Sequence, residues 1–348
     1  MSSDVTQIPG YEVAQVEAWA AANTDLVPPF VWVRLEGGHS NLTYLLNDAN
    51  GAEAVIRRPP QGELLPKAHD MGREFKIISA LDGRGVPVAK PHAYCEDPAV
   101  TGAHFYIMDK VGGRALYTAD DVEEWIPVEH RPAVGLSFIS TLAKLHSLDP
   151  VDIGLGDLGR LDGYVQRQLR TWYGSWTSST GAADHDDPRV HEMHERFLAE
   201  APEQGPARVV HGDFGLHNTM IDPEGSLVAV LDWEIATLGD PLADFAYSLN
   251  AWSTPASPAG ADSQPPTTVE GMAEPEVLIS EYQNHTGADL GRLDFYRAFN
   301  YFKTACILHG VYARYRRGQK STEGIDMEHL LGRCIMAVDT AAEYAARM

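Results

Sequence analysis

Two short stretches of this 348-residue chain carry residues whose types and spacing suit phosphoryl transfer. Residues 209–218 begin with an apolar pair, continue to Asp213 and end at Asn218, and residues 228–234 run through apolar side chains into Asp232. A carboxylate such as Asp213 can orient an attacking hydroxyl. The amide oxygen of Asn218 and the carboxylate of Asp232 are ligands that suit Mg²⁺. Together they predict a metal-assisted transfer of a phosphoryl group.

The two apolar runs are predicted to be short buried strands. Residues 221–226, Ile-Asp-Pro-Glu-Gly-Ser, are typical of a turn. We therefore expect the runs at 209–210 and 228–231 to pair as a hairpin. That pairing would bring the three polar residues to one end of a small sheet.

A metallohydrolase is the alternative chemistry for the same stretches. Its ligands would be His211, Asp213, His217 and Asp232, because mixtures of imidazole and carboxylate bind transition metals. This alternative leaves Asn218 without a role, and it also leaves the features upstream unexplained.

Three strands are predicted near the start of the chain, at residues 30–35, 42–46 and 54–57. The turn between the first two is rich in glycine, and glycine lets backbone N–H groups approach phosphate oxygens closely. The candidate phosphate-binding residues in this turn are Gly37, Gly38, His39, Ser40 and Asn41.

Three motifs in order resemble the aminoglycoside phosphotransferase and choline kinase-like family, whose members are related to protein kinases. They are H-G-D-x-x-x-x-N at residues 211–218, the Asp at position 232, and G-D-P-x-x-D at residues 239–244. The resemblance implies an α+β, two-lobed protein-kinase-like fold. It places a small β-rich N-lobe at residues 1–108, which binds the nucleotide phosphates. A larger, mainly helical C-lobe at residues 109–348 carries the catalytic loop, the metal ligands and the acceptor site.

The resemblance also implies ATP and Mg²⁺ as cofactors and a small-molecule hydroxyl as acceptor. Asp213 would then be the catalytic residue, with Asn218 and Asp232 as metal ligands. The family's third strand carries a lysine that contacts the phosphates, and Arg57 stands at the matching position here. Arginine keeps the charge and can bind phosphate bidentately, but it does not replace lysine freely.

The resemblance implies a helical glutamate as the partner of Arg57. Glu74 is the candidate, since it neighbours the apolar face of a helix predicted at residues 67–81. Arg58 would point to the other face of its strand and is expected to be solvated. Residues 105–113 resemble the family's hinge. That implies adenine contacts from the Asp109 carbonyl and the Val111 N–H, with Met108 beside the ring.

Residues 57–69 and 167–176 resemble, more narrowly, the branch that includes kinase-like domains fused to acyl-CoA dehydrogenases. The acceptor stays open between an aminoglycoside, a hydroxyacyl thioester of coenzyme A and another hydroxyl compound. An aminoglycoside site would need several carboxylates, and the candidates are Asp184, Asp186, Asp187, Glu270, Glu274 and Glu281. Arg57 in place of lysine also leaves open a catalytically silent nucleotide-binding module.

Composition limits the setting of this chemistry. The formal net charge of −22 argues against nucleic acid or an anionic membrane surface as a partner. Three well-separated cysteines predict neither a disulfide framework nor a zinc site. No secretory signal and no apolar run of membrane-spanning length are visible, so we expect a cytoplasmic protein. The sequence does not indicate an oligomeric state.

Overall fold

The computed structural model describes residues 8–35, 41–62, 69–252, 264–319 and 321–348. The chain divides into two compact units. The first comprises Met1–Ala115, Asn218–Asp222 and Leu227–Ile235, and the second comprises Leu116–His217, Pro223–Ser226 and Ala236–Met348. The chain therefore passes between the two units five times, once at the peptide bond between His217 and Asn218.

An antiparallel five-stranded sheet forms the centre of the first unit, in the order β1-β2-β3-β5-β4. Its strands are β1 (Val31–Arg34), β2 (Leu42–Asn47), β3 (Glu53–Arg58), β4 (Pro91–Cys95) and β5 (Phe105–Asp109). The three strands predicted near the start of the chain are thus present, each within two residues of its expected ends. Val, Ile, Tyr and Phe supply the β-forming side chains.

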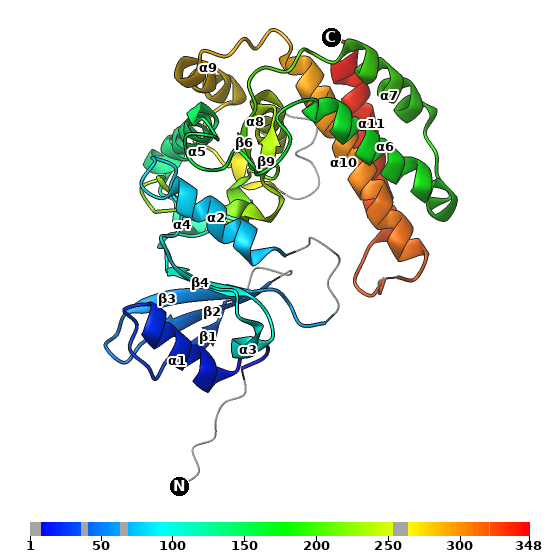
Figure 1. The fold of residues 1–348 in the computed structure, drawn as a ribbon. Coiled ribbons are helices and arrows are strands. Elements are labelled where there is room, and N and C mark those ends of the chain that lie inside the picture. Colours follow the sequence, from blue (N-terminus) through cyan, green and yellow to red (C-terminus); the bar gives the residue numbers. More distant parts are fainter. Residues whose placement is uncertain (1–7, 36–40, 63–68, 253–263, 320) are drawn as a thin grey trace. The chain divides into compact units, whose positions relative to one another are not determined.

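Helices pack against this sheet because the side chains of each strand alternate between its two faces. On one face Ile56 joins a buried cluster with Val16 and Ala20 of α1 (Val13–Asn23), which lies across the sheet (Figure 1). The short α3 (Pro98–Thr101) contacts α1. Arg57, the next residue of β3, instead faces α2 (Met71–Leu81).

The expectation that Arg58 is solvated is wrong. Its side chain is buried, with only 6% of the residue exposed. Nε donates to the carbonyl of Pro59, and Nη1 donates to the carbonyls of Thr101 and Gly10. The alternation of side chains along the strand predicted that Arg58 and Arg57 face opposite sides of the sheet. It did not predict that other segments of the chain cover Arg58.

The predicted hairpin between residues 209–210 and 228–231 is also wrong. β8 (Leu227–Val230) pairs with β7 (Thr219–Ile221), which immediately follows the catalytic loop. β6 (Arg208–Val210) pairs instead with β9 (Thr237–Gly239) in a separate two-stranded sheet. The apolar runs identify the strands, but β7 is only three residues long and partly coincides with the predicted turn.

The second unit is mainly helical. Its helices are α4 (Ala119–Trp125), α5 (Arg131–Ser147), α6 (Tyr164–Ala183), α7 (Pro188–Glu200), α8 (Pro241–Ala251), α9 (Pro275–Thr286), α10 (Leu293–Arg316) and α11 (Met327–Ala345). α6, α7, α10 and α11 lie side by side (Figure 1). Their shared core includes Trp176, Phe197, Phe299 and Val338, all fully or almost fully buried.

The short 3₁₀ turns of the chain are η1 (Val128–His130), η2 (Leu216–Asn218), η3 (Trp233–Ile235) and η5 (Pro266–Thr268). A small antiparallel-sheet lobe followed by a larger helical lobe confirms the predicted α+β class. Within the described ranges no helix is long and apolar enough to cross a membrane. Cys95, Cys306 and Cys334 are buried free thiols.

Candidate active site

Arg57 joins two carboxylates within the first unit. Its Nε lies 3.0 Å from Oε2 of Glu74, and its Nη2 lies 2.9 Å from Oδ1 of Asp232. Tyr106, the cross-strand partner of Arg57, donates its hydroxyl to the same Glu74 oxygen at 2.9 Å. The Glu74 side chain is only 2% exposed. Glu74 of α2 and Asp232 therefore hold the guanidinium, and Tyr106 of β5 holds Glu74 in turn.

The carboxylates keep this arginine charged. Burial by itself lowers the pKa of Arg57, but Glu74 and then Asp232 oppose burial, and the net result is a raised pKa. A permanent cation held by flanking carboxylates is suited to nucleotide phosphates.

Asn218 and Asp232 lie at the same end of the β7–β8 hairpin. Thr219 pairs with Val230, and the N–H of Leu231 donates to the carbonyl of Asn218 at 2.8 Å. Asp232 has a φ of +59°, which lies in the left-handed region that residues other than glycine rarely adopt. Such a conformation persists only where surrounding contacts impose it.

The oxygen ligands of these two residues fit Mg²⁺, which prefers hard oxygen donors and takes others from phosphates and water. No group of three or more His, Cys, Asp or Glu side chains in the described part of the chain is arranged to hold a metal ion. The ligand set of the metallohydrolase alternative is therefore not assembled within either unit.

The other nucleotide candidates are only partly described. Gly37, Gly38, His39 and Ser40 lie outside the described residues. Asn41 is buried, and within the described part of the chain neither its Oδ1 nor its Nδ2 has a hydrogen-bond partner. A ligand at the glycine-rich turn could satisfy this amide, since a buried amide without a partner is costly.

The predicted hinge begins at the end of β5. Met108 pairs with Val55, and the N–H of Asp109 donates to the carbonyl of Lys90. Met108, Asp109 and Val111 are all partly exposed. Their contact with adenine stays a prediction.

The loop that carries Asp213 lies in the second unit and is attached to α8. Asp244 accepts hydrogen bonds from the N–H of His211 at 2.7 Å and of Gly212 at 2.8 Å. The buried His146 lies with its Nε2 3.3 Å from Oδ2 of Asp244. Asp240 caps the start of α8 by accepting from the N–H of Leu242. The G-D-P-x-x-D motif thus begins a helix that supports the H-G-D-x-x-x-x-N loop.

Both oxygens of the Asp213 carboxylate have contacts. Tyr247 of α8 donates its hydroxyl to Oδ1, and Nε2 of His217 lies 3.4 Å from Oδ2. Burial raises the pKa of Asp213, but the contacts with His217 and Tyr247 outweigh burial and the pKa is lowered. The carboxylate is therefore ionised at neutral pH and can accept a hydrogen bond from a hydroxyl.

A cavity of about 240 Å³ opens beside this loop in the second unit. Its lining is mostly apolar or aromatic and comprises Leu116, Tyr117, Phe138, Gly215, Leu216, His217, Ser248, Ala251, Trp252, Pro266 and Thr267. Among the described lining residues, His217, which contacts Asp213, is the one ionisable group besides the Tyr117 phenol. The hydroxyl of Thr267 is buried and has no hydrogen-bond partner among the residues that the structure describes.

The geometry groups the predicted residues within each unit. Arg57, Glu74 and Asp232 contact one another in the first unit, and Asp213 lies in the second. Sequence reasoning missed Tyr247. Its position three residues after Asp244, on the same helical face, was the available clue.

Residues 31–265 match the model of the phosphotransferase enzyme family. The chain is 39% identical to acyl-CoA dehydrogenase family member 11 of Gallus gallus and 37% identical to its Homo sapiens counterpart. Each match covers 82% of this chain but only 37% and 36% of the relative. The chain therefore spans little more than a third of the length of these relatives.

Solved structures give the same result for the fold. The crystal structure of a proposed aminoglycoside phosphotransferase from Ralstonia eutropha is 29% identical, with a TM-score of 0.83, and the match covers 97% of this chain and 99% of that one. An ADP-bound aminoglycoside phosphotransferase, 15% identical with a TM-score of 0.59, covers 96% of this chain and 99% of its own. These matches confirm the predicted resemblance and the kinase-like fold. The chain belongs to the phosphotransferase enzyme family.

Proposed function

We propose that this protein transfers the γ-phosphoryl group of ATP to a hydroxyl of a small molecule. The observation that carries the proposal is the state of Asp213: an ionised carboxylate, oriented by Tyr247 and His217, beside a cavity large enough for part of an acceptor. An acceptor hydroxyl would donate to this carboxylate. Its oxygen then forms the new bond to phosphorus as the bond to the leaving ADP oxygen breaks, and its proton passes to Asp213.

The nucleotide is assigned to the first unit. Arg57 binds the phosphates, and Glu74 orients Arg57. Asn41 and the glycine-rich turn contribute further polar groups, while Met108, Asp109 and Val111 contact the base. Asn218 and Asp232 would hold Mg²⁺, which when bound neutralises phosphate charge. Positioning and electrostatic stabilisation supply most of the rate in such reactions.

The cavity beside Asp213 favours an acceptor whose part inside the cavity is uncharged and largely apolar. None of the described residues that line this cavity is acidic. A polycationic aminoglycoside would need such carboxylates, whereas an acyl chain with a hydroxyl would contact Phe138 and Trp252 and could satisfy the Thr267 hydroxyl. We therefore favour the hydroxyacyl thioester over the aminoglycoside.

Two of the carboxylates considered for an aminoglycoside, Asp186 and Asp187, are already engaged in the second unit. Asp186 accepts from the indole N–H of Trp176 at 2.9 Å, and its Oδ1 lies 3.0 Å from His191. Asp187 caps α7 and pairs with Arg189 at 2.6 Å. These bonds give both residues structural roles.

Thermal denaturation with Mg²⁺-ATP tests the nucleotide half of the proposal. We expect millimolar Mg²⁺-ATP to raise the melting temperature, because a ligand that binds the folded state stabilises it. Asp232→Asn should weaken this response, and Asp152→Asn, at an exposed position of the second unit, should not. No response of the wild type would contradict the proposal. Activity restored only by Zn²⁺ or Mn²⁺ after chelation would favour the metallohydrolase.

A catalytically silent nucleotide-binding module is the second candidate, and Arg57 in place of lysine is the observation that favours it. Such a module would bind Mg²⁺-ATP but transfer no phosphate to any acceptor. Transfer assays therefore separate the two candidates, as set out at the end of the Discussion.

A further inference from the structure

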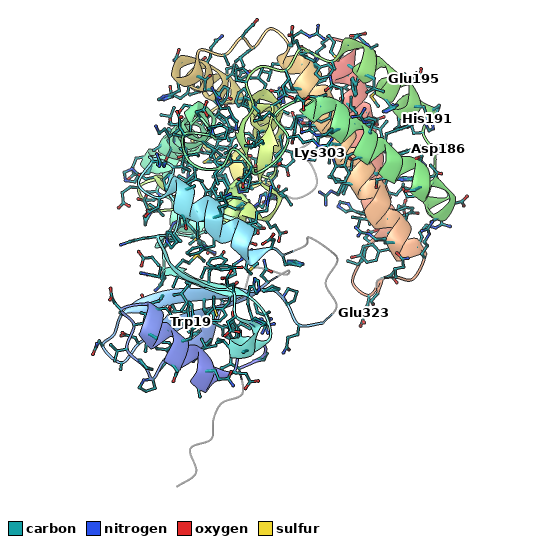
Figure 2. All side chains as sticks on the ribbon, viewed as in Figure 1. Trp19, Asp186, His191, Glu195, Lys303 and Glu323 are labelled. Carbon is teal, nitrogen blue, oxygen red and sulfur yellow. The ribbon has the colours of Figure 1, made fainter. Side chains whose placement is uncertain are left out.

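Lys303 is a buried cation close to Asp213 that the proposed chemistry does not yet use. It lies on the long helix α10 (Figure 2), and only 9% of the residue is exposed. Its Nζ makes one long hydrogen bond, 3.5 Å to the carbonyl of Gly212. Lys303 forms no salt bridge with any carboxylate in the described part of the chain.

Two aromatic rings also lie beside this ammonium group. Nζ lies 5.2 Å from the ring centre of Tyr247 and 6.0 Å from that of Trp172. Cation–π contacts of this kind only partly replace water. Burial lowers the pKa of Lys303, while Asp244 and Asp213 act in the opposite direction. A buried ammonium with so few partners lowers the stability of the fold, and a role in function would explain why it is there.

The contacts of Lys303 lead to Asp213 by two routes. The first is Gly212, the residue before Asp213. Its N–H donates to Asp244 and its carbonyl accepts from Lys303, so both backbone polar groups of Gly212 are held. The second is Tyr247, which lies beside the ammonium and donates its hydroxyl to Oδ1 of Asp213. A cation beside a phenol ring strengthens the phenol as a donor.

We propose that Lys303 is a positioning residue for the reaction, which fixes the orientation of the Asp213 carboxylate through the Gly212 peptide and the Tyr247 ring. This inference rests on the proposed function, because it assigns Lys303 to the residue that receives the acceptor hydroxyl. The positive charge also favours the ionised form of Asp213.

A packing role is the simpler explanation of Lys303, and it makes different predictions. If the aliphatic stem only fills the space between Trp172 and Tyr247, Lys303→Met should preserve every property of the site, because methionine has a similar length and no charge. Lys303→Arg should then be the more disruptive change. Under our proposal the order is reversed.

The test compares Lys303→Met and Lys303→Arg with Lys144→Met, an exposed lysine of α5 that contacts none of these residues. The first readout is the titration of Asp213 in protein labelled with ¹³C at aspartate carboxylates, assigned through the signal that Asp213→Asn removes. His211, His217, Tyr247 and Asp244 also face this site and are unchanged in all three variants. We expect the pKa of Asp213 to rise in Lys303→Met and to stay near the wild-type value in the other two.

The second readout is steady-state phosphoryl transfer. We expect Lys303→Met to lower kcat roughly tenfold, because misplacing a reacting group is costly, while KM for ATP stays unchanged. Lys303→Arg should restore most of the rate. An unchanged Asp213 titration in Lys303→Met would overturn the inference, and so would an equal loss of rate in Lys303→Arg.

The two readouts separate this inference from the proposed function. If the wild-type protein transfers no phosphate, the proposed function fails, whereas the titration of Asp213 still shows whether Lys303 acts on that carboxylate. If Lys303→Met does not fold, Lys303→Gln provides the uncharged variant.

Discussion

At the scale of single residues, the chemistry depends on how Asp213 and Arg57 keep their charges. Tyr247 and His217 lower the pKa of Asp213 although burial raises it. A carboxylate of lowered pKa is a weak base, so it is better suited to orienting a hydroxyl than to removing its proton early. That role agrees with a loose transition state, in which the nucleophile needs little deprotonation before attack.

Replacing Arg57 tests the ion pair between Arg57 and Glu74 in the first unit. Arg57→Met would leave Glu74, which is 2% exposed, as a buried charge without its cation. We expect the free energy of unfolding of this unit to fall by about 3 kcal/mol, as measured by urea denaturation, and the stabilisation by Mg²⁺-ATP to be lost. Arg57→Lys should keep both properties in part, because one ammonium cannot match the separate contacts of Nε and Nη2. Equal behaviour of the two variants would show that the charge of Arg57 is irrelevant.

At the scale of elements, α8 organises the loop that carries Asp213. Asp244 binds two N–H groups of the loop, Tyr247 binds Asp213, and the hydroxyl of Ser248 donates to the carbonyl of Phe214. The helix itself begins at Asp240 and Pro241, a favourable N-cap followed by proline in the first turn. One helix start therefore determines the position of several active-site groups.

Asp244→Ala tests this dependence. The change leaves the N–H groups of His211 and Gly212 and the imidazole of His146 without their buried acceptor. We expect the free energy of unfolding to fall by about 3 kcal/mol and phosphoryl transfer to be lost. Urea denaturation and a transfer assay measure the two effects. Asp152→Ala, at an exposed position, should change neither, and a similarly mild result for Asp244→Ala would contradict this role of α8.

The sequence predicted elements better than it predicted their partners. The apolar runs at residues 30–35, 42–46 and 54–57 located β1, β2 and β3, because β-branched and aromatic residues bounded by turn residues are typical of strands. The pairing of β6 with β9 was missed, since an apolar run of three residues does not identify its neighbour in a sheet. The positive φ of Asp232 was also beyond prediction, because aspartate has no strong preference for that region.

The candidate site shows the same limit. The motif residues were found because their order and spacing are distinctive, and Arg57 and Glu74 followed from the resemblance. Tyr247 and Lys303 belong to no such motif. Their roles arise from the packing of α8 and α10 around the loop, which periodicity alone does not reveal.

At the scale of the whole molecule, buried histidines couple stability to pH. His309 is fully buried in the second unit, stacked on Trp176 at 3.9 Å, with Nδ1 2.7 Å from the Ser179 hydroxyl. Burial lowers its pKa, and it likewise lowers the pKa of His194. When the pH falls through about 6.5, the unfolded chain takes up protons that the folded protein does not.

We therefore expect stability to be fully present above pH 7 and to decrease as the pH falls towards the lower pKa values of the folded state. Melting temperatures recorded between pH 7.5 and 5.5 would measure this slope. His309→Gln should flatten it relative to the wild type, whereas His329→Gln, at an exposed position, should not. The carboxylates of lowered pKa, such as Asp213 and Asp244, add a further loss only in more acidic solution. Equal slopes for all three proteins would contradict this assignment to His309.

The most direct test of the central claim is to follow the γ-phosphoryl group of labelled ATP into an acceptor. Wild type, Asp213→Asn and Lys144→Met would be incubated with Mg²⁺-ATP and two panels, hydroxyacyl-CoA compounds and aminoglycosides. We predict label on a hydroxyacyl compound with wild type and Lys144→Met. With Asp213→Asn we predict a rate lower by at least about a hundredfold while the protein still binds ATP. Transfer to aminoglycosides alone would overturn the acceptor assignment. Undiminished transfer by Asp213→Asn, or none by a wild type that binds ATP, would contradict the account.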